Sequence, residues 1–138
     1  GLTGFSAVSD QWSLASVNPG ANNNPDPTLA LAGEAELEFH TRTGTPCIPY
    51  QSTARGWFAK TAAGERVAPD VTRAFDNAAN RAVLAGLQKL SHESGVSVQA
   101  LALTELTHRP FPVLPITSAS NDAQMDTLLE ALNLLDKE

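Results

Sequence analysis

The sequence is poor in several residue types and patterns that would mark a specialised protein. Its 138 residues include one cysteine, so no disulfide can form within the chain, and Cys47 is expected to be a buried thiol in a reducing cytoplasm. Nine lysine and arginine residues and a formal charge of -6 argue against nucleic-acid binding. No apolar run approaches the ~20 residues of a membrane helix, and the first residues lack the features of a signal peptide. These shortages predict a cytoplasmic protein that binds neither nucleic acid nor membrane.

The sequence also lacks the groupings that metal sites and covalent catalysis require. No pair of His, Cys or carboxylate residues has a metal-ligand spacing, and Ser52 has no recognisable basic partner. His40 lies among polar residues of a predicted helix, so we expect an exposed histidine. No metal centre and no covalent nucleophile are therefore predicted.

Short apolar runs alternate with amphipathic segments along one domain-sized chain, 1–138. Strands are predicted at 5–8, at 46–50 and around 113–114. Helices are predicted at about 29–42, from 69 to 94, from 98 to about 106, and after 121, with Gly44 and Gly95 as stops and Ser97 and Asn121 as caps. Two helices carry apolar stripes for the core: Phe75, Ala79, Val83, Leu87 and Leu90 in one, and Met125, Leu128, Leu129, Leu132 and Leu135 in the other. Residues 17–28 and 51–68 are predicted to be long loops.

The order of these elements predicts an α/β fold. Strands that alternate with helices imply a parallel sheet, here of about three strands with flanking helices. Ligand sites in such sheets lie at the C-terminal ends of the strands. Polar residues follow all three predicted strands, at 9–11, 50–52 and 117–121. The sequence therefore predicts a single site at this edge of the sheet.

Several segments resemble the C-terminal half of bacterial aldo-keto reductases. They are SDQWSL at 9–14, FHTRTGTP at 39–46, PY at 49–50, ARGWF at 54–58, GVSVQALAL at 95–103 and FPVLPITSAS at 111–120. The resemblance implies a partial (half) TIM-barrel that contains the sixth to eighth strand-helix units. A complete barrel needs ~250 residues, and the family's catalytic Asp, Tyr, Lys and His belong to the half not found here. We therefore expect no catalysis by this chain alone, and Tyr50 is not the catalytic tyrosine.

The resemblance also implies a site for NADP or NAD. Gln11 matches the glutamine that bonds the nicotinamide carboxamide, and Tyr50 matches the aromatic residue on which the ring stacks. Gln51, Ser52 and Arg55 match the segment near the pyrophosphate. The segment that binds the adenosine phosphate is matched by the loop and helix start at Ser118, Ala119, Ser120, Asn121 and Gln124. A helix N-terminus at this place favours an anion. Asp10, Gln51 and Ser118 depart from the commoner family residues, and 117–124 contains no basic residue, so the choice between NAD and NADP stays open.

Three functions remain open at this point. The chain could be a non-catalytic module that keeps part of a dinucleotide site. It could instead be the C-terminal portion of an NAD(P)H-dependent aldehyde or ketone oxidoreductase, active only with an N-terminal partner chain, or a folded oligomeric relic without a ligand. Because an isolated fragment of a barrel would expose edges and apolar faces, we expect a homo-oligomer, a dimer above all, that covers the barrel interior, or a local rearrangement in which the long loops or terminal segments cover it. Whether Gly1 is a natural start stays open.

Overall fold

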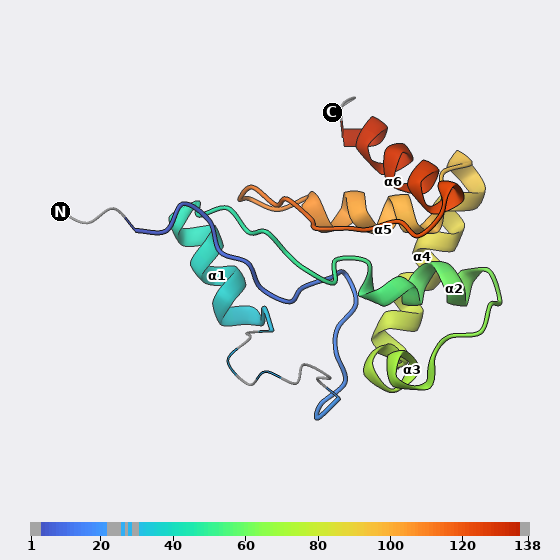
Figure 1. Ribbon diagram of the computed structural model, residues 1–138, viewed down its shortest axis with the longest axis horizontal. Helices are drawn as coiled ribbons and strands as arrows, with labels where there is room; N and C mark the ends of the chain where they lie inside the picture. Colours follow the sequence, from blue (N-terminus) through green and yellow to red (C-terminus); the bar gives the residue numbers. More distant parts are fainter. Residues whose placement is uncertain (1–3, 22–25, 27, 29–30, 136–138) are drawn as a thin grey trace.

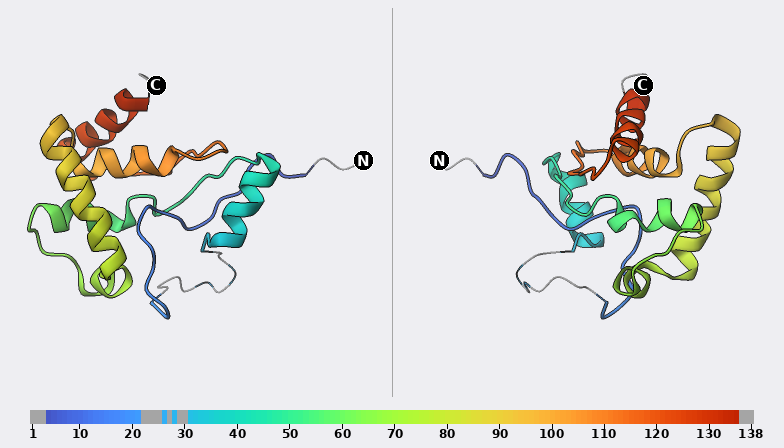
Figure 2. Two further views of the ribbon diagram at one scale, coloured as in Figure 1. Left: turned by 180° about the vertical axis from the view of Figure 1, so that it is seen from behind. Right: turned by 45° about the vertical axis from the view of Figure 1, so that its right-hand side comes forward.

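The computed structural model describes residues 4–21, 26, 28 and 31–135, and these are mainly helical. The elements in chain order are α1 (Glu34–Thr43), the 3-10 helix η1 (Ala54–Gly56), α2 (Trp57–Ala62), α3 (Pro69–Phe75), α4 (Ala78–Ser94), α5 (Val98–Thr107) and α6 (Asp122–Leu135). Helix α1 lies at the opposite end of the molecule from α2, α3 and α4, while α5 and α6 run side by side (Figures 1 and 2). No helix in the described ranges is both long and apolar enough to cross a membrane.

The predicted α/β fold, a partial (half) TIM-barrel-like parallel sheet of about three strands, is wrong. The described residues form isolated parallel bridges and no sheet: Val8 pairs with Cys47, Cys47 with Val113, and Gln11 with both Tyr50 and Leu31. The three predicted strand regions do lie beside one another, but as extended segments in a helix-rich fold. The barrel interior that a homo-oligomer was expected to cover is not formed by the described residues, and oligomerisation itself stays a prediction.

Two local features interrupt the pairing of these segments. The Cys47 N–H donates to the Pro112 carbonyl and the Leu114 N–H donates to the Cys47 carbonyl, both at 2.9 Å. The next bond of a parallel ladder would need an N–H at residue 49, which is a proline and has none. On the other side, the Ile48 carbonyl accepts the Ser9 hydroxyl at 2.8 Å. One bond is therefore missing from each pairing, which resumes beyond the gap: the Tyr50 N–H donates to the Asp10 carbonyl at 3.0 Å and the Ile116 N–H donates to the Pro49 carbonyl at 2.9 Å. The bridges stay isolated because these gaps interrupt the ladder.

The predicted helix ends are confirmed where they rest on local capping. Gly44 and Gly95 follow α1 and α4 with φ values of 67° and 75°, the left-handed conformation that glycine adopts without a steric penalty. Ser97 caps α5 by accepting the Ala100 N–H at 3.2 Å. Asn121 caps α6 by accepting the Gln124 N–H at 2.9 Å. Short-range hydrogen bonds thus set these boundaries.

Three predicted segments differ from the structure. The helix predicted at about 29–42 begins only at Glu34, and residues 31–33 are not helical. The helix expected from 69 to 94 is divided into α3 and α4, because Asn77 is extended and caps α4 through the Asn80 N–H. The loop expected at 51–68 contains η1 and α2, whose Trp57 and Phe58 are each 1% exposed. The loop expected at 17–28 lies partly outside the described residues.

The buried side chains form three clusters. The largest gathers Trp57, Phe58, Phe75, Leu84 and Leu87 between α2, α3 and α4. The other two are Trp12, Cys47, Leu106 and Phe111 beneath α1, and Ala100, Leu103 and Ala131 between α5 and α6. Helix α1 thus packs on the extended segments rather than on the helical end.

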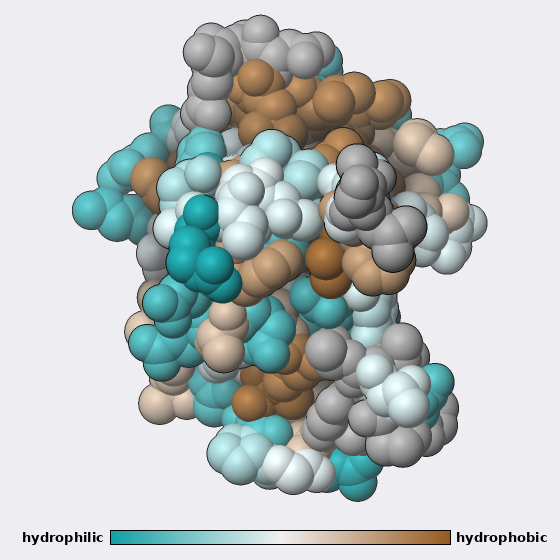
Figure 3. All heavy atoms as spheres, turned by 90° about the vertical axis from the view of Figure 1, so that its left-hand side faces the viewer, coloured by the Kyte–Doolittle hydropathy of each residue, from teal (hydrophilic) through white to brown (hydrophobic). Residues whose placement is uncertain are grey.

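The predicted core stripes are only partly correct. Helix α4 buries Leu84 and Leu87, while Val83 and Leu90 are exposed. Helix α6 buries Ala131 and leaves Met125, Leu129 and Leu132 exposed, and apolar surface gathers where α6 lies, at the top of the molecule (Figure 3). The predicted stripes are therefore rotated relative to the faces that the helices bury.

His40 is buried, so the prediction of an exposed histidine is wrong. Its ring is stacked on Phe111 with centroids 5.1 Å apart, and Nδ1 lies 2.7 Å from the Thr45 carbonyl oxygen. Because a carbonyl only accepts hydrogen bonds, Nδ1 is the donor. The ring therefore joins the end of α1 to the cluster beneath it.

Candidate functional site

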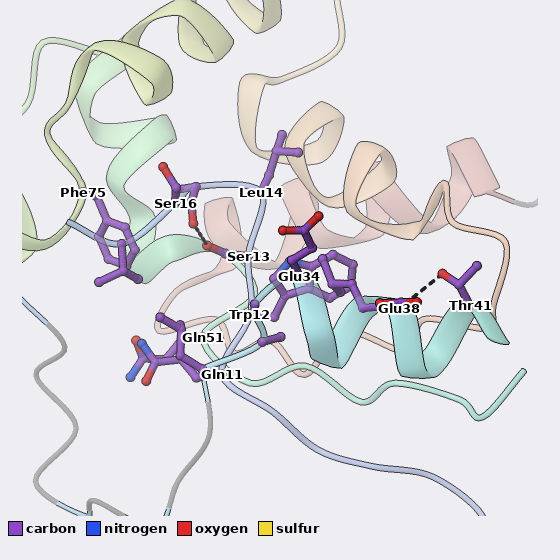
Figure 4. A pocket seen from close by; sticks show the side chains of 16 residues that line it. Gln11, Trp12, Ser13, Leu14, Ser16, Glu34, Glu38, Thr41, Gln51 and Phe75 are labelled. Atoms are coloured by element: carbon purple, nitrogen blue, oxygen red, sulfur yellow. Dashed lines mark hydrogen bonds between the residues drawn. The ribbon is translucent and has the colours of Figure 1, made fainter. Parts of the chain in front are cut away.

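A cleft of about 670 Å³ opens between the segment 11–17, residues 31–34 and α1 (Figure 4). Trp12 and Leu37 supply apolar wall, while Glu34, Glu38 and Thr41 come from α1. Gln11 and Gln51 enter it from the two segments that the bridge between Gln11 and Tyr50 joins. Both amides point to the same side (Figure 4). An amide both donates and accepts hydrogen bonds, so this end of the cleft suits a ligand carrying its own amide.

The backbone of Gln11 is fixed by hydrogen bonds, whereas its side-chain oxygen lacks a hydrogen-bond partner among the described residues. Its carbonyl accepts the Ala32 N–H at 3.0 Å, and it is bridged to Tyr50 and Leu31. The residue is 5% exposed, and Oε1 is buried with no hydrogen-bond partner among the described residues. A buried acceptor without a partner costs about 1–3 kcal/mol. A ligand that brings an N–H to this oxygen would remove that cost.

The chain between the two predicted cofactor segments has an unusual backbone. Gln51, Ala54 and Arg55 have φ values of 55°, 50° and 54°, the left-handed region that non-glycine residues seldom occupy. The Ala54 N–H donates to the Gln51 carbonyl at 2.8 Å and closes the turn. Backbone strain of this kind is concentrated at functional sites. The turn directs Gln51 toward the first cleft and Arg55 toward a second one.

Arg55 forms an ion pair with α3. Its Nη1 lies 2.7 Å from Oδ2 of Asp70, and both side chains are partly exposed. The hydrogen bond from Arg55 and its positive charge lower the pKa of Asp70. The ion pair therefore fixes the position of the Arg55 guanidinium, and the Asp70 carboxylate compensates part of its positive charge.

The second cleft, of about 640 Å³, lies between η1 and α2 on one side and the first turns of α5 and α6 on the other. Four of the predicted cofactor residues line it: Arg55, Ser118, Ser120 and Gln124. The Gln124 amide is partly engaged, because its Oε1 accepts the Ser120 N–H at 2.8 Å. The serine hydroxyls and the two helix N-termini make this cleft suited to an anion.

The remaining predicted site residues lie elsewhere within the described structure. Ser52 is buried and its hydroxyl donates to the Ile116 carbonyl at 2.7 Å. Asn121 caps α6, and Tyr50 is half-buried beside the first cleft without lining either cleft. Ala119 is also half-buried and lines neither cleft. For these residues the structure displays mainly structural contacts, and a cofactor role stays a prediction.

A small cavity of about 10 Å³ connects the residues of the two clefts. Gln11, Gln51 and Arg55 line it together with Phe75. Its volume is close to that of one water molecule, so the cavity itself is too small for a ligand. A ligand that occupied both clefts would lie outside this cavity. The predicted residues at the tips of the first two segments thus meet at one place.

Two residues of the second cleft were missed in the sequence. Lys60 lay in the loop predicted at 51–68, and Gln99 lay in the helix predicted from 98, with no site role proposed for either residue. A basic residue next to the aromatic pair Trp57 and Phe58 was the available signal for Lys60. Nothing in the local sequence indicated Gln99, whose position depends on how α5 packs against α2.

Cys47 is a structural residue. It is fully buried beneath α1, and burial together with the nearby Asp10 charge raises the pKa of its thiol to about 11. The thiolate that nucleophilic chemistry requires is therefore scarce at neutral pH.

Comparison with known proteins agrees with the resemblance noted in the sequence. The model of the aldo/keto reductase family matches residues 21–138. No curated protein and no solved structure matches the chain. Because the match covers most of its length, the chain belongs to the aldo/keto reductase family.

Proposed function

We propose that this chain binds a nicotinamide dinucleotide, NADH or NADPH, along the two clefts. The nicotinamide end would occupy the first cleft and the adenosine phosphate end the second. In this family the cofactor supplies hydride transfer; the residues of this chain bind and orient it. We propose no catalytic residue here, and carbonyl reduction would need groups beyond those assigned.

The observation that carries this proposal is the unpartnered Oε1 of Gln11. The oxygen accepts hydrogen bonds only, and the carboxamide of nicotinamide offers an N–H to it. Trp12 and Leu37 provide apolar surface in the same cleft for a planar ring. Our proposal therefore depends on Gln11, whereas stacking on Tyr50 stays a separate prediction.

Gln51 and Arg55 support the middle of the ligand. Both have left-handed backbones, and both line the small cavity between the clefts. Arg55 can donate to a pyrophosphate oxygen while one edge of its guanidinium remains with Asp70, because the group carries five N–H donors.

Titration of the intact chain with NADPH and with NADH tests the proposal. Trp12 lines the first cleft, so binding should change tryptophan fluorescence, and calorimetry should confirm the stoichiometry. We expect Gln11→Leu to weaken both cofactors by about tenfold, the loss of one buried hydrogen bond. Thermal unfolding should show that the variant remains folded.

Gln88→Leu is the matched control, because Gln88 is an exposed glutamine on α4 that lines neither cleft. It should leave cofactor affinity unchanged. Absence of binding at millimolar NADPH and NADH would contradict the proposal, and so would equal affinities of wild type and Gln11→Leu. Carbonyl reduction by the pure chain would contradict the absence of a catalytic residue.

A further inference from the structure

The first cleft carries two carboxylates that have no partner among the described residues. Glu34 and Glu38 lie one turn apart on α1 and line the cleft, and neither carboxylate forms an ion pair or a hydrogen bond within the described structure. Figure 4 shows both side chains on the α1 side of the cleft, apart from the amides of Gln11 and Gln51. Two like charges four residues apart on a helix repel each other. A cation between them would relieve this repulsion.

The needs of α1 itself account for a neighbouring acidic residue but not for Glu38. The Glu36 carboxylate is engaged, because its Oε2 accepts the Gly33 N–H at 2.9 Å at the start of the helix. Glu34 lies in the first turn, where the helix dipole favours a negative charge, whereas Glu38 lies beyond that turn. Arg42 follows Glu38 by four residues and makes no ion pair with it in the described structure. The helix therefore leaves both charges available to a ligand.

The rest of the described lining of this cleft contains no positive charge. Apart from the two glutamates it consists of apolar, hydroxyl and amide residues, and Trp12, Leu31 and Leu37 supply much of its apolar surface. The Arg109 guanidinium lies 5.4 Å from the centroid of the Trp12 ring, but Arg109 does not line the cleft. The cleft therefore combines apolar surface with an uncompensated negative charge.

Gln11 is an independent sign that this cleft receives a ligand with hydrogen-bond donors. Its buried Oε1 has no partner among the described residues, and the residue lines the same cleft. Like the carboxylates of Glu34 and Glu38, this oxygen only accepts hydrogen bonds. An ammonium group offers three N–H donors together with a positive charge. These three groups therefore favour a cation that carries donors over an anion.

We propose that the first cleft binds a small primary ammonium compound with a short apolar body, whose ammonium group lies between Glu34 and Glu38. The inference rests on the proposed function, because the nicotinamide carboxamide occupies Gln11 and the ammonium compound lies beside the nicotinamide, toward α1. The apolar body contacts Trp12 and Leu37, and the two carboxylates disfavour anions of the same size. No reaction step is assigned to these residues.

Three four-carbon probes that differ at one end test this assignment: 4-aminobutan-1-ol is cationic at neutral pH, butane-1,4-diol is neutral and 4-hydroxybutanoate is anionic. Each probe is titrated into the intact chain with and without NADH, and binding is followed by NMR and by tryptophan fluorescence. We expect the cation to bind about tenfold more tightly than the diol, and the anion to bind more weakly still. Raising the salt concentration to about 0.5 M should reduce the preference, because both carboxylates are exposed to solvent.

Glu34→Gln and Glu38→Gln should each reduce the preference for the cation, and the double variant should remove it. Glutamine and glutamate have similar helix propensities, so α1 should remain folded, which circular dichroism checks. Glu93→Gln is the matched control, because Glu93 is an exposed glutamate on α4 that lines neither cleft, and it should retain the full preference. Equal binding of 4-aminobutan-1-ol and butane-1,4-diol by wild type would overturn the inference, as would an unchanged preference in the double variant.

Two further results separate this inference from the proposed function. If NADH binds and wild type does not prefer the cation, the ammonium assignment fails and cofactor binding stands. If no dinucleotide binds but the cation binds in a way that depends on Glu34 and Glu38, the ammonium site stands and the proposed function fails. Ammonium chloride should compete only weakly with 4-aminobutan-1-ol; an equal affinity would indicate a site for any cation and overturn the assignment of an organic ligand.

Discussion

The Nε2 of His40 lies 3.8 Å from Oδ2 of Asp10, and both side chains are almost completely buried. The contact joins the last turn of α1 to the extended segment that leads into Gln11. Because Phe111 also stacks on the imidazole, three separate parts of the chain meet at this ring. The position of the first cleft, between α1 and this segment, therefore depends on His40.

Replacement of His40 by alanine should destabilise the fold strongly. The change leaves a cavity beside Phe111 and an unpaired Thr45 carbonyl, so we expect the free energy of unfolding to fall by about 2–4 kcal/mol. Unfolding in urea measures this change in the free energy of unfolding. His92→Ala, at an exposed position of α4, should change the value by no more than about 0.5 kcal/mol. Equal effects of the two substitutions would show that His40 is not a packing residue.

Cys47 should resist thiol reagents while the protein is folded. With a pKa of about 11, caused first by burial and then by Asp10, the thiolate at pH 8 is about one part in a thousand. We expect slow labelling in the native state and rapid labelling in urea. Asp10→Asn should lower the pKa of the thiol, while Asp126→Asn on the exposed part of α6 should not. Native labelling as fast as that of unfolded chain would refute this account.

Two glycines should respond to alanine with opposite signs. Gly86 lies inside α4 with no atom within 4 Å of the position that a Cβ would occupy, so Gly86→Ala should stabilise the protein by about 0.5–1 kcal/mol through helix propensity. Gly95 ends the same helix with φ 75°, so Gly95→Ala should destabilise it by about 1 kcal/mol. Unfolding in urea compares the free energies of unfolding of the two variants with that of wild type. A stabilising Gly95→Ala would contradict the left-handed cap.

The pKa of Asp70 should depend on Arg55. The hydrogen bond and charge of Arg55 lower the pKa of Asp70 in the folded state. The ionised carboxylate therefore stabilises the fold at pH values above its unfolded pKa of about 3.9. This stabilisation is lost as the pH falls through the lower pKa of the folded state. Arg55→Gln should raise the pKa toward its ordinary value, as followed by NMR titration of the carboxyl carbon. Arg66→Gln, at another exposed arginine, should leave it unchanged. If the pKa of Asp70 were the same in wild type and in Arg55→Gln, the ion pair would not form in solution.

The sequence predicted a single site at the ends of the apolar segments, and the structure divides its residues between two clefts. Gln11 and Gln51 line one cleft, while Arg55, Ser118, Ser120 and Gln124 line the other. Their roles in cofactor binding stay predictions. Ser52 and Asn121 carry the same local signal, yet their side chains bond to the Ile116 carbonyl and the Gln124 N–H. A polar residue at a segment end can therefore serve a ligand or the fold, and the pattern alone does not separate the two.

By itself the sequence determined four of the helix ends and the family. Gly44, Gly95, Ser97 and Asn121 act through hydrogen bonds that span a few residues, so local sequence suffices to place them. Tertiary structure alone decided that Pro49 and Ser9 would interrupt the parallel pairing, that His40 would be buried, and that Lys60 and Gln99 would line the same cleft. Those outcomes depend on contacts between segments far apart in the chain, and residue periodicity carries no information about which segments will meet.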